Sequence, residues 1–276
     1  MYTIFIPTDF SDAARNAVGH AVTHFGKENR FVLYHAFGEI KSGAGSMISI
    51  NDILREAAEN DMKEKVDWFK EQYGVRPDLV DMVLEQGEVV ESITRAARKL
   101  EASIVVLGTT GATGLKEIIY GSVASGVLKR CDVPVMAIPL HYKPVPIKNI
   151  VFAADLQRDD DDRLPDVFLH IARKYNSTVK IVTVVKPGKA ITLDEAEEGY
   201  DLHRMMGDIP HSFDCVENED VEEGLRSYLI GKEAQLVVVK PHRESWLREL
   251  FSPSISKSLA QHLTIPVMSI PEQSPA

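Results

Sequence analysis

Short runs of β-branched and apolar residues alternate along the chain with longer stretches whose apolar residues recur at helical spacing. In the first half, the short runs predict strands at about residues 2–7, 31–36, 80–84, 103–108 and 134–138. The longer stretches predict helices at about residues 11–26, 50–73, 88–101 and 122–131. Helices that connect successive strands require a parallel sheet covered on both faces. The pattern therefore predicts an open, doubly wound α/β sheet, a fold that binds ligands at the carboxyl ends of its strands.

The same pattern occurs twice in the chain. Two pairs of segments match at a constant spacing of 132 positions: Ile104–Leu107 with Leu236–Val239, and Val133–Pro139 with Ile265–Pro271. Near the two starts, Ile4–Asp9 matches Ile150–Asp155 at a spacing of 146, so the second copy is about 14 residues shorter in its middle. We therefore expect two copies of one domain in tandem.

The boundary between the copies is predicted at the proline-containing segment Pro139–Pro146. Proline cannot continue a helix or a central strand, and several prolines close together stiffen an extended connector. We place the first domain at residues 1–140 and the second at residues 147–272.

Composition narrows the classes of function. Hydrophobic residues make up 44% of the chain and charged residues 26%, as in ordinary globular proteins. The 31 Lys and Arg residues are outnumbered by 41 Asp and Glu residues, and the formal net charge of −10 disfavours a nucleic-acid groove and an anionic membrane surface. With two cysteines, Cys131 and Cys215, no zinc cluster is available, and a reducing cytoplasm is the expected location.

The sequence shows neither a membrane span nor a secretory signal. The strongest apolar runs, Ile104–Leu107 and Leu236–Val239, are far shorter than the ~20 residues of a membrane helix. The first residues lack the basic and long apolar regions of a signal peptide. We expect no contact with a membrane.

A glycine-rich segment carries the candidate chemistry. Gly108–Gly114 follows the fourth predicted strand, and Gly121-Ser122-Val123 opens the next helix. Glycine lets backbone N–H groups approach a ligand closely, and the free N–H groups at a helix start favour an anion, so this segment can hold phosphate oxygens. The structural alternative is that the glycines only turn the chain and Ser122 only caps a helix.

Two known phosphate-binding motifs are excluded. Gly121 and Gly126 have the glycine spacing of a P-loop, but Val127 stands where the essential lysine belongs. No G-x-G-x-x-G sequence follows the first strand, which ends in Pro7-Thr8-Asp9. Walker-type hydrolysis and binding of NAD are therefore not expected.

These residues resemble the universal stress protein family in its tandem form. The resemblance rests on Pro7-Thr8-Asp9-Phe10-Ser11, on the spacing Gly108-x2-Gly111-x9-Gly121-Ser122, and on the closing strand Val133-Pro134-Val135. It implies two tandem Rossmann-like domains, of the adenine nucleotide alpha hydrolase-like kind, each an open five-stranded parallel sheet flanked by helices. In the ATP-binding branch of the family, such a domain holds an adenine nucleotide at this edge of the sheet.

The resemblance also implies the residues of the site. Carried over to this sequence, the adenine and ribose would lie at Pro7, Thr8, Asp9 and Ala36, the ribose also beside Leu107 and Gly108, and the phosphates at Gly111, Gly121, Ser122 and Val123. The implied cofactor is ATP, or ADP or AMP. Whether Mg²⁺ also binds, held by Asp9 through water, is left open.

The second copy has lost this signature. At the same spacing, Gly108, Gly111 and Gly121 correspond to Lys240, Arg243 and Pro253, and only Ser254 repeats Ser122. Long side chains would occupy the space of a nucleotide, and proline offers no N–H group. We interpret the second domain as structural. The alternative is a cationic pocket of Lys240, His242 and Arg243 that binds a different anion.

Four other candidates are judged weaker. Asp159–Asp162 is interpreted as a solvated loop before a helix and not as a metal site. His20 and His24 share a helix face but lack a third ligand, so they are expected at the surface or partly buried. His35 is expected to pack in the core, and Cys131 is expected to be buried and inert.

No catalytic residue is assigned, because no lysine or arginine is placed at the phosphates to support hydrolysis. The first hypothesis is a stress-response regulatory protein that binds ATP or ADP in its first domain and signals to an unidentified protein partner through loop 109–120. The alternatives are a slow ATPase and an interaction scaffold whose second domain binds another anion. By the resemblance, strands 134–138 and 266–270 pair between the domains as an internal pseudo-dimer, and both a monomer and a homodimer stay open.

Overall fold

The computed structural model describes residues 1–37, 50–109, 121–154, 156, 163–240 and 265–271. Several positions that the sequence singled out lie outside these ranges: Gly111, most of loop 109–120, Asp155, Asp159–Asp162, His242, Arg243, Pro253 and Ser254.

The first half of the chain forms the predicted alternation of strands and helices. Its elements are β1 (Thr3–Pro7), α1 (Asp12–Phe25), β2 (Arg30–Phe37), α2 (Ile50–Tyr73), a 3-10 turn (Pro77–Leu79), β3 (Val80–Gln86), α3 (Val89–Lys99), β4 (Ile104–Gly108), α4 (Ser122–Arg130) and β5 (Val135–Ile138). Each predicted strand and helix is present, with ends that differ by one or two residues. The 3-10 turn before β3 was not predicted.

The second half repeats this order. Its elements are β6 (Asn149–Ala153), α5 (Asp166–Tyr175), β7 (Thr178–Val185), α6 (Leu193–Met206), β8 (His211–Glu217), α7 (Val221–Leu229), β9 (Leu236–Val239) and β10 (Val267–Ser269). Among these helices, α6 takes the place that α2 has in the first half, between the second and third strands, and it has 14 residues where α2 has 24. The predicted shortening therefore falls largely on this helix.

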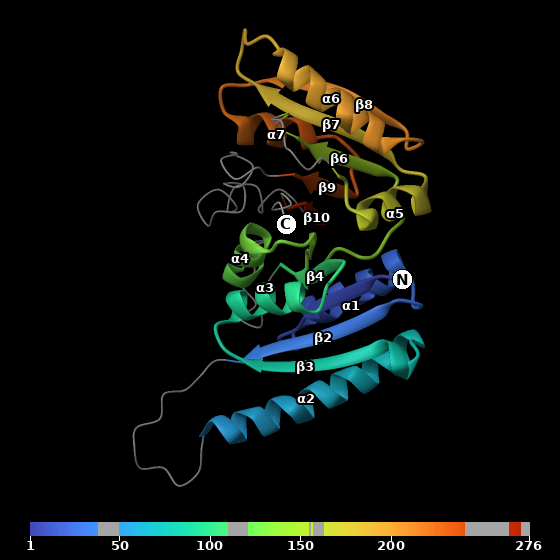
Figure 1. Cartoon of the computed structure of the whole chain (residues 1–276), viewed down its shortest axis with the longest axis vertical. Coiled ribbons are helices and arrows are strands. Elements are labelled where there is room, and N and C mark those ends of the chain that lie inside the picture. Colours follow the sequence, from blue (N-terminus) through green and yellow to red (C-terminus); the bar gives the residue numbers. More distant parts are fainter. Residues whose placement is uncertain (38–49, 110–120, 155, 157–162, 241–264, 272–276) are drawn as a thin grey trace.

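The strands of both halves form one continuous sheet in the order β3-β2-β1-β4-β5-β10-β9-β6-β7-β8 (Figure 1). Within each half the neighbouring strands are parallel, as predicted. The halves meet where β5 pairs antiparallel with β10, with Met136 opposite Met268. Because the strand direction reverses at this pair, the carboxyl ends of the strands of the two halves lie on opposite edges of the sheet.

Helices cover both faces of the sheet, and successive residues of each strand point to opposite faces. One buried cluster combines Ile4 and Ile6 of β1 with helices α1, α2, α5 and α6, and a second combines Phe5 with α3, α4 and α7. Each cluster contains residues from both halves of the chain. Among the described residues, no helix has the length and apolar composition that crossing a membrane requires.

A buried chain of hydrogen bonds ties α1 to the connector and to the second half. His20 Nε2 lies 2.8 Å from the carbonyl oxygen of Tyr142, His20 Nδ1 lies 3.1 Å from His24 Nε2, and His24 Nδ1 lies 3.0 Å from the hydroxyl of Tyr175. The three histidine contacts are satisfied together when each ring is neutral, with Nε2–H of each histidine as a donor and the Tyr175 hydroxyl donating to His24. The carbonyl oxygen of Thr23 lies 3.2 Å from the same hydroxyl and competes for its proton. Lys174 adds bonds from its Nζ to the carbonyl oxygens of Thr23 and His24.

The expectation of surface or partly buried histidines is therefore wrong, since His20 and His24 are 0% and 1% exposed. Their helical spacing places them on one face of α1, but it does not show that the connector and α5 cover this face. Burial, with smaller contributions from His20 and Lys174, lowers the pKa of His24 to about 3. Burial also lowers the pKa of His20.

This depressed pKa makes the stability depend on pH in a defined direction. Between pH 3 and pH 6.5 the unfolded chain binds a proton at His24 that the folded chain excludes. The contribution of His24 to the free energy of unfolding is therefore complete above pH 6.5 and decreases as the pH falls below that value. For His24 alone we expect a loss of about 2 kcal/mol in the free energy of unfolding between pH 7.5 and pH 5. Urea unfolding at the two pH values measures it.

The matched variants are His24→Gln and His141→Gln. His141 lies exposed in the connector, so its variant should keep the full pH dependence, whereas His24→Gln should reduce the dependence by about 2 kcal/mol. An equal pH dependence in all three proteins would contradict the assignment to His24.

Candidate functional site

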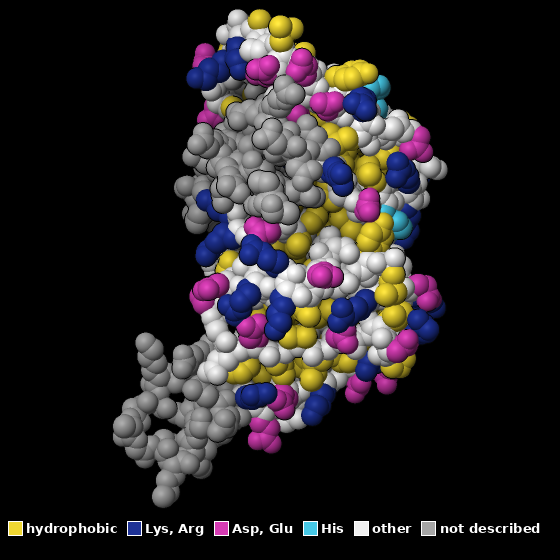
Figure 2. Space-filling view, viewed as in Figure 1, with side chains coloured by type: hydrophobic (Ala, Val, Ile, Leu, Met, Phe, Trp, Pro, Cys, Tyr) yellow, Lys and Arg dark blue, Asp and Glu magenta, His cyan; other side chains and the backbone are white. Residues whose placement is uncertain are grey.

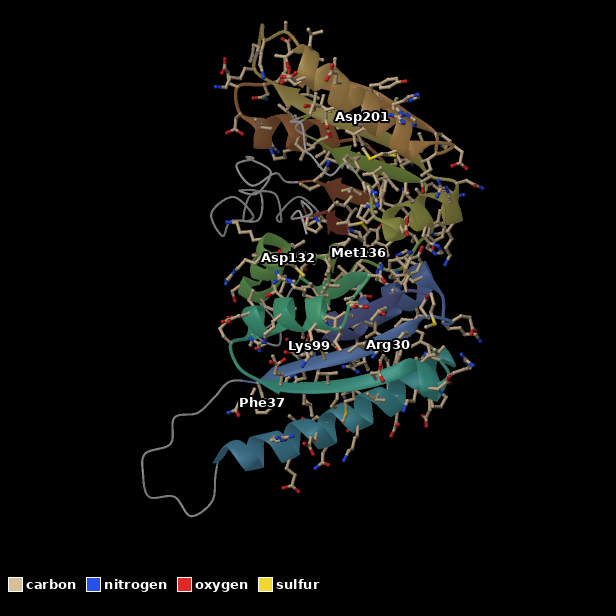
Figure 3. All side chains as sticks on the ribbon, in the orientation of Figure 1. Arg30, Phe37, Lys99, Asp132, Met136 and Asp201 are labelled. Atoms are coloured by element: carbon tan, nitrogen blue, oxygen red, sulfur yellow. The ribbon has the colours of Figure 1, made fainter. Side chains whose placement is uncertain are left out.

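The carboxyl ends of β1, β2 and β4 meet at one edge of the sheet. Pro7, the last residue of β1, is in register with Tyr34 of β2, and the N–H of Thr8 donates to the carbonyl oxygen of Tyr34 at 2.8 Å. On its other side β1 pairs with β4. The segment from Pro7 to Asp9 therefore lies between the ends of β2 and β4. In Figure 3 the label of Phe37 marks this end of β2, and the label of Arg30 marks the opposite end.

The turn after β1 is built by short side chains that accept backbone hydrogen bonds. Thr8 Oγ1 accepts from the N–H of Phe10 at 3.0 Å, and Asp9 Oδ1 accepts from the N–H of Ser11 at 3.1 Å. Ser11 then caps α1, since its hydroxyl accepts from the N–H of Ala14. These bonds fix the backbone of the turn, while the side chain of Asp9 stays exposed at the edge.

His35 holds the same turn from the neighbouring strand. Phe10 has a φ of +65°, in the left-handed region that a phenylalanine rarely adopts. Its ring packs on His35 at a centroid distance of 4.5 Å, and His35 Nδ1–H donates to the carbonyl oxygen of Thr8 at 2.7 Å. From the sequence, His35 was expected to pack in the core. In the structure its ring is half-buried and fixes the turn.

Gly108 allows α1 to approach β4 closely. A Cβ atom at this position would lie 2.7 to 2.8 Å from the backbone and Cβ of Ala13, which is closer than real Cβ atoms come. Two reasons for this glycine were left open from the sequence, close approach to a ligand and a turn of the chain. In the structure the close neighbour is the first turn of α1, so Gly108 brings the start of that helix to the edge.

The start of α4 faces the end of β4. The N–H of Gly121 donates to the carbonyl oxygen of Thr109 at 2.6 Å, and the N–H of Thr109 donates to Ile138 at 3.0 Å. Gly121 is the N-cap of α4 and has no side chain that could accept bonds from the first-turn N–H groups. Ser122 is exposed and Val123 is half-buried. This helix start can therefore receive an anion.

Thr109 is a polar residue that the sequence analysis did not select. It is buried, and its Oγ1 has no hydrogen-bond partner among the residues that the structure describes. A buried hydroxyl of this kind usually has a partner. A threonine in a glycine-rich segment gives no sequence signal that separates it from a turn residue.

The remaining predicted positions differ in what they offer. Ala36 is half-buried near the end of β2, whereas the side chain of Leu107 packs in the core, so that only its main chain reaches the edge. Gly111 is outside the described residues. The structure brings to this edge Pro7, Thr8, Asp9, Ala36, Gly108, Gly121, Ser122 and Val123.

A buried long side chain takes the place of Gly108 in the second half. Lys240 occupies the position of Gly108 and is only 5% exposed. Its Nζ lies 3.6 Å from Oε1 of Glu198, a residue of α6 that is 2% exposed. The positive charge of Lys240 is thus compensated within the core, which weakens the alternative of a cationic pocket for an anion.

The remaining weaker candidates concern a metal ion and a cysteine. Among the described residues, no group of three or more His, Cys, Asp or Glu side chains could hold a metal ion. Cys131 is buried, as predicted, and burial raises the pKa of its thiol to about 11.

Comparisons with known proteins point to one family. The family model described as the universal stress protein family matches residues 1–139. A universal stress protein of Methanocaldococcus jannaschii is 33% identical over 141 residues, which cover 49% of this chain and 80% of that protein. A second universal stress protein of the same organism is 26% identical over 151 residues, and the match covers 93% of that protein.

One solved structure extends the similarity to both halves. The crystal structure of a universal stress protein from Archaeoglobus fulgidus superimposes with a TM-score of 0.72 and covers 99% of this chain and 98% of its own. Its sequence identity is 18%, so the likeness concerns the fold alone.

The buried pair of Lys240 and Glu198 leads to a prediction for stability. Glu198→Gln leaves a buried ammonium without its carboxylate and should lower the free energy of unfolding by about 3 kcal/mol. The double variant Lys240→Met, Glu198→Leu removes both charges and should recover most of the loss. Urea unfolding measures both. If the double variant were as unstable as the single one, shape and not charge would dominate at this position.

Proposed function

The chain belongs to the universal stress protein family, and from this premise we propose that its first half binds an adenine nucleotide, ATP or ADP, at the carboxyl edge of β1, β2 and β4. The protein would act as a regulator whose state depends on the bound nucleotide. A role in the stress response is proposed on family membership alone.

The start of α4 is the observation that carries this proposal. Its N-cap, Gly121, has no side chain, Ser122 is exposed beside it, and the hydroxyl of Thr109, at the end of the adjacent strand, has no partner among the described residues. Backbone N–H groups at a helix start suit phosphate oxygens. The family model covers the half of the chain that contains this helix.

The other parts of a nucleotide would contact the end of β1. The turn of Thr8 and Asp9 and the half-buried Ala36 border the same edge. This turn is held in place by His35, so it would require little reorganisation on binding. Asp9, exposed in the turn, would hold Mg²⁺ through water, and the ion would supply charge that neutralises the phosphates.

Binding without rapid hydrolysis fits the side chains assigned to the edge. Those residues include no lysine or arginine that would stabilise the charge of a transferring phosphoryl group. We therefore propose a binding protein with slow or no turnover, and slow ATP hydrolysis stays the alternative.

The two halves would have different roles. The second half, with Lys240 and Glu198 in the core where the first half has Gly108, would bind no nucleotide and support the fold. We keep the division into residues 1–140 and 147–272 as a proposal. Two free cysteines, Cys131 and Cys215, fit a cytoplasmic location.

A charge at residue 122 tests the site without harming the fold. An acidic residue in the first turn of a helix is favourable, by about 0.3 to 1 kcal/mol, so Ser122→Glu should fold normally. Its carboxylate would repel the phosphates. We expect calorimetric titration with ATP and Mg²⁺ to give one site per chain, and at least about tenfold weaker binding in Ser122→Glu, which is about 1.4 kcal/mol.

Leu193→Glu is the matched control, because Leu193 is the exposed first residue of α6 and receives the same added charge. This variant should bind ATP as the unmodified chain does. Equal affinity in Ser122→Glu would contradict the site, and two bound nucleotides per chain would contradict the role given to the second half. No binding at all would leave the scaffold as the better hypothesis.

A further inference from the structure

A hollow of about 500 Å³ lies between α6 and the sheet face of β7 and β8. A volume of this size is typical of small-molecule sites. Figure 3 labels Asp201 on α6, the helix that forms one wall, and Figure 2 shows hydrophobic side chains at the surface of this end of the molecule. The lining of the hollow includes the hydrophobic residues Leu156, Ile181, Ile191, Ala196, Tyr200 and Phe213.

The hollow exists because the second copy lacks the long helix of the first. In the first half, α2 fills the equivalent face with Met62, Val66 and Phe69, which are buried. The shorter α6 presents Ala196 and Gly199 there instead. A Cβ atom added at Gly199 would come no closer than 3.8 Å to the ring of Phe213. Space therefore remains between helix and sheet.

Large apolar side chains around the hollow stay in contact with water. Tyr200 is 63% exposed, Ile191 is 50% exposed and Phe213 is 46% exposed. Such exposure of neighbouring hydrophobic side chains is costly for the isolated chain, and a ligand that covers them would remove this cost. The concave shape favours a small molecule over a flat protein surface.

The charges at the hollow select against an anion. Its charged lining residues are two acids, Glu195 and Asp214, and no Lys or Arg belongs to the lining. Glu195 is held by Lys189 and Thr192, and Asp214 by the hydroxyl of Tyr228 and by Lys180, whose Nζ lies 3.9 Å away. His203 Nδ1 lies 2.8 Å from His211 Nε2, so this ring nitrogen is also engaged. An anion would find no Lys or Arg in the lining to pair with, and a cation would find both carboxylates already bonded.

We propose that this hollow is a binding site for an uncharged, largely apolar small molecule. The site belongs to the second half and is separate from the edge of β1, β2 and β4. It does not rest on the proposed nucleotide binding, and Ser122→Glu should leave it unchanged.

Two dyes with the same ring system test the ligand class. N-phenyl-1-naphthylamine is neutral, and 8-anilinonaphthalene-1-sulfonate carries a sulfonate on similar rings. Titration of the full chain, followed by dye fluorescence, should show saturable binding of the neutral dye at one site. The sulfonate should bind at least about tenfold more weakly. Equal or tighter binding of the sulfonate would overturn the assignment to an uncharged ligand.

A filled hollow tests the location. Gly199→Leu places a large side chain against Phe213 and replaces a glycine inside a helix, which favours the helix. The matched control, Arg204→Leu, adds the same side chain at an exposed position of α6. We expect Gly199→Leu to weaken binding of the neutral dye at least about tenfold and Arg204→Leu to leave it unchanged. Unchanged binding in Gly199→Leu would overturn the proposal.

Cys215 supplies a second readout that does not need a variant. It lines the hollow and is exposed, whereas Cys131 is buried. The neutral dye should slow alkylation of Cys215 by N-ethylmaleimide, as followed by mass spectrometry, and dye binding without protection would place the dye elsewhere. Light scattering on the same samples tests whether a second copy of the chain covers the hollow. A dimer that the dye dissociates would show that a second copy covers the hollow, and it would overturn the proposal of a small-molecule site.

Discussion

The antiparallel pair of β5 and β10 is the contact on which the rest of the structure depends. All four residues of β5 and all three of β10 are buried, and Met136 lies directly opposite Met268. If the two halves were apart, each would expose an apolar strand edge with unpaired backbone groups. The pair satisfies both edges at once and lets the two buried clusters run through both halves. Two repeats thereby become one ten-stranded sheet.

Once this pair fixes the halves, each repeat can change its own edge without loss of the common core. At the end of the fourth strand of a repeat, Gly108 admits α1, while Lys240 fills the equivalent place and pairs with Glu198. The helix between the second and third strands differs in the opposite direction. In the first repeat α2 fills its face of the sheet, whereas in the second repeat the shorter α6 leaves a hollow. The first half has a glycine at the end of its fourth strand and is packed beneath its long helix. The second half has a buried ion pair at that place and a hollow beneath its short helix.

The sequence could predict the features that depend on the local spacing of apolar residues and on the repetition of segments along the chain. Alternating apolar runs located the strands, and the constant spacing between the copies revealed the tandem order, because both signals lie within short segments. It could not predict which helix face meets the other half, so His20 and His24 were expected too near the surface. Nor could it predict the contact of Phe10 with His35, which joins the turn after β1 to β2, or the buried hydroxyl of Thr109, which has no periodic signature.

The position of α1 connects these observations. Its first turn lies against Gly108 at the candidate nucleotide edge, and its later turns carry Asn16, His20 and His24, which bond to the connector and to Tyr175 of α5. A helix of 14 residues moves as a rigid element. A movement of the backbone at the edge must therefore either stay within the turn of Thr8 to Ser11 or move α1 as a whole. Moving α1 would displace the buried, neutral His20 and His24. Since breaking their hydrogen bonds would leave buried polar groups without partners, the structure favours a stiff edge whose changes are confined to the turn and to the start of α4.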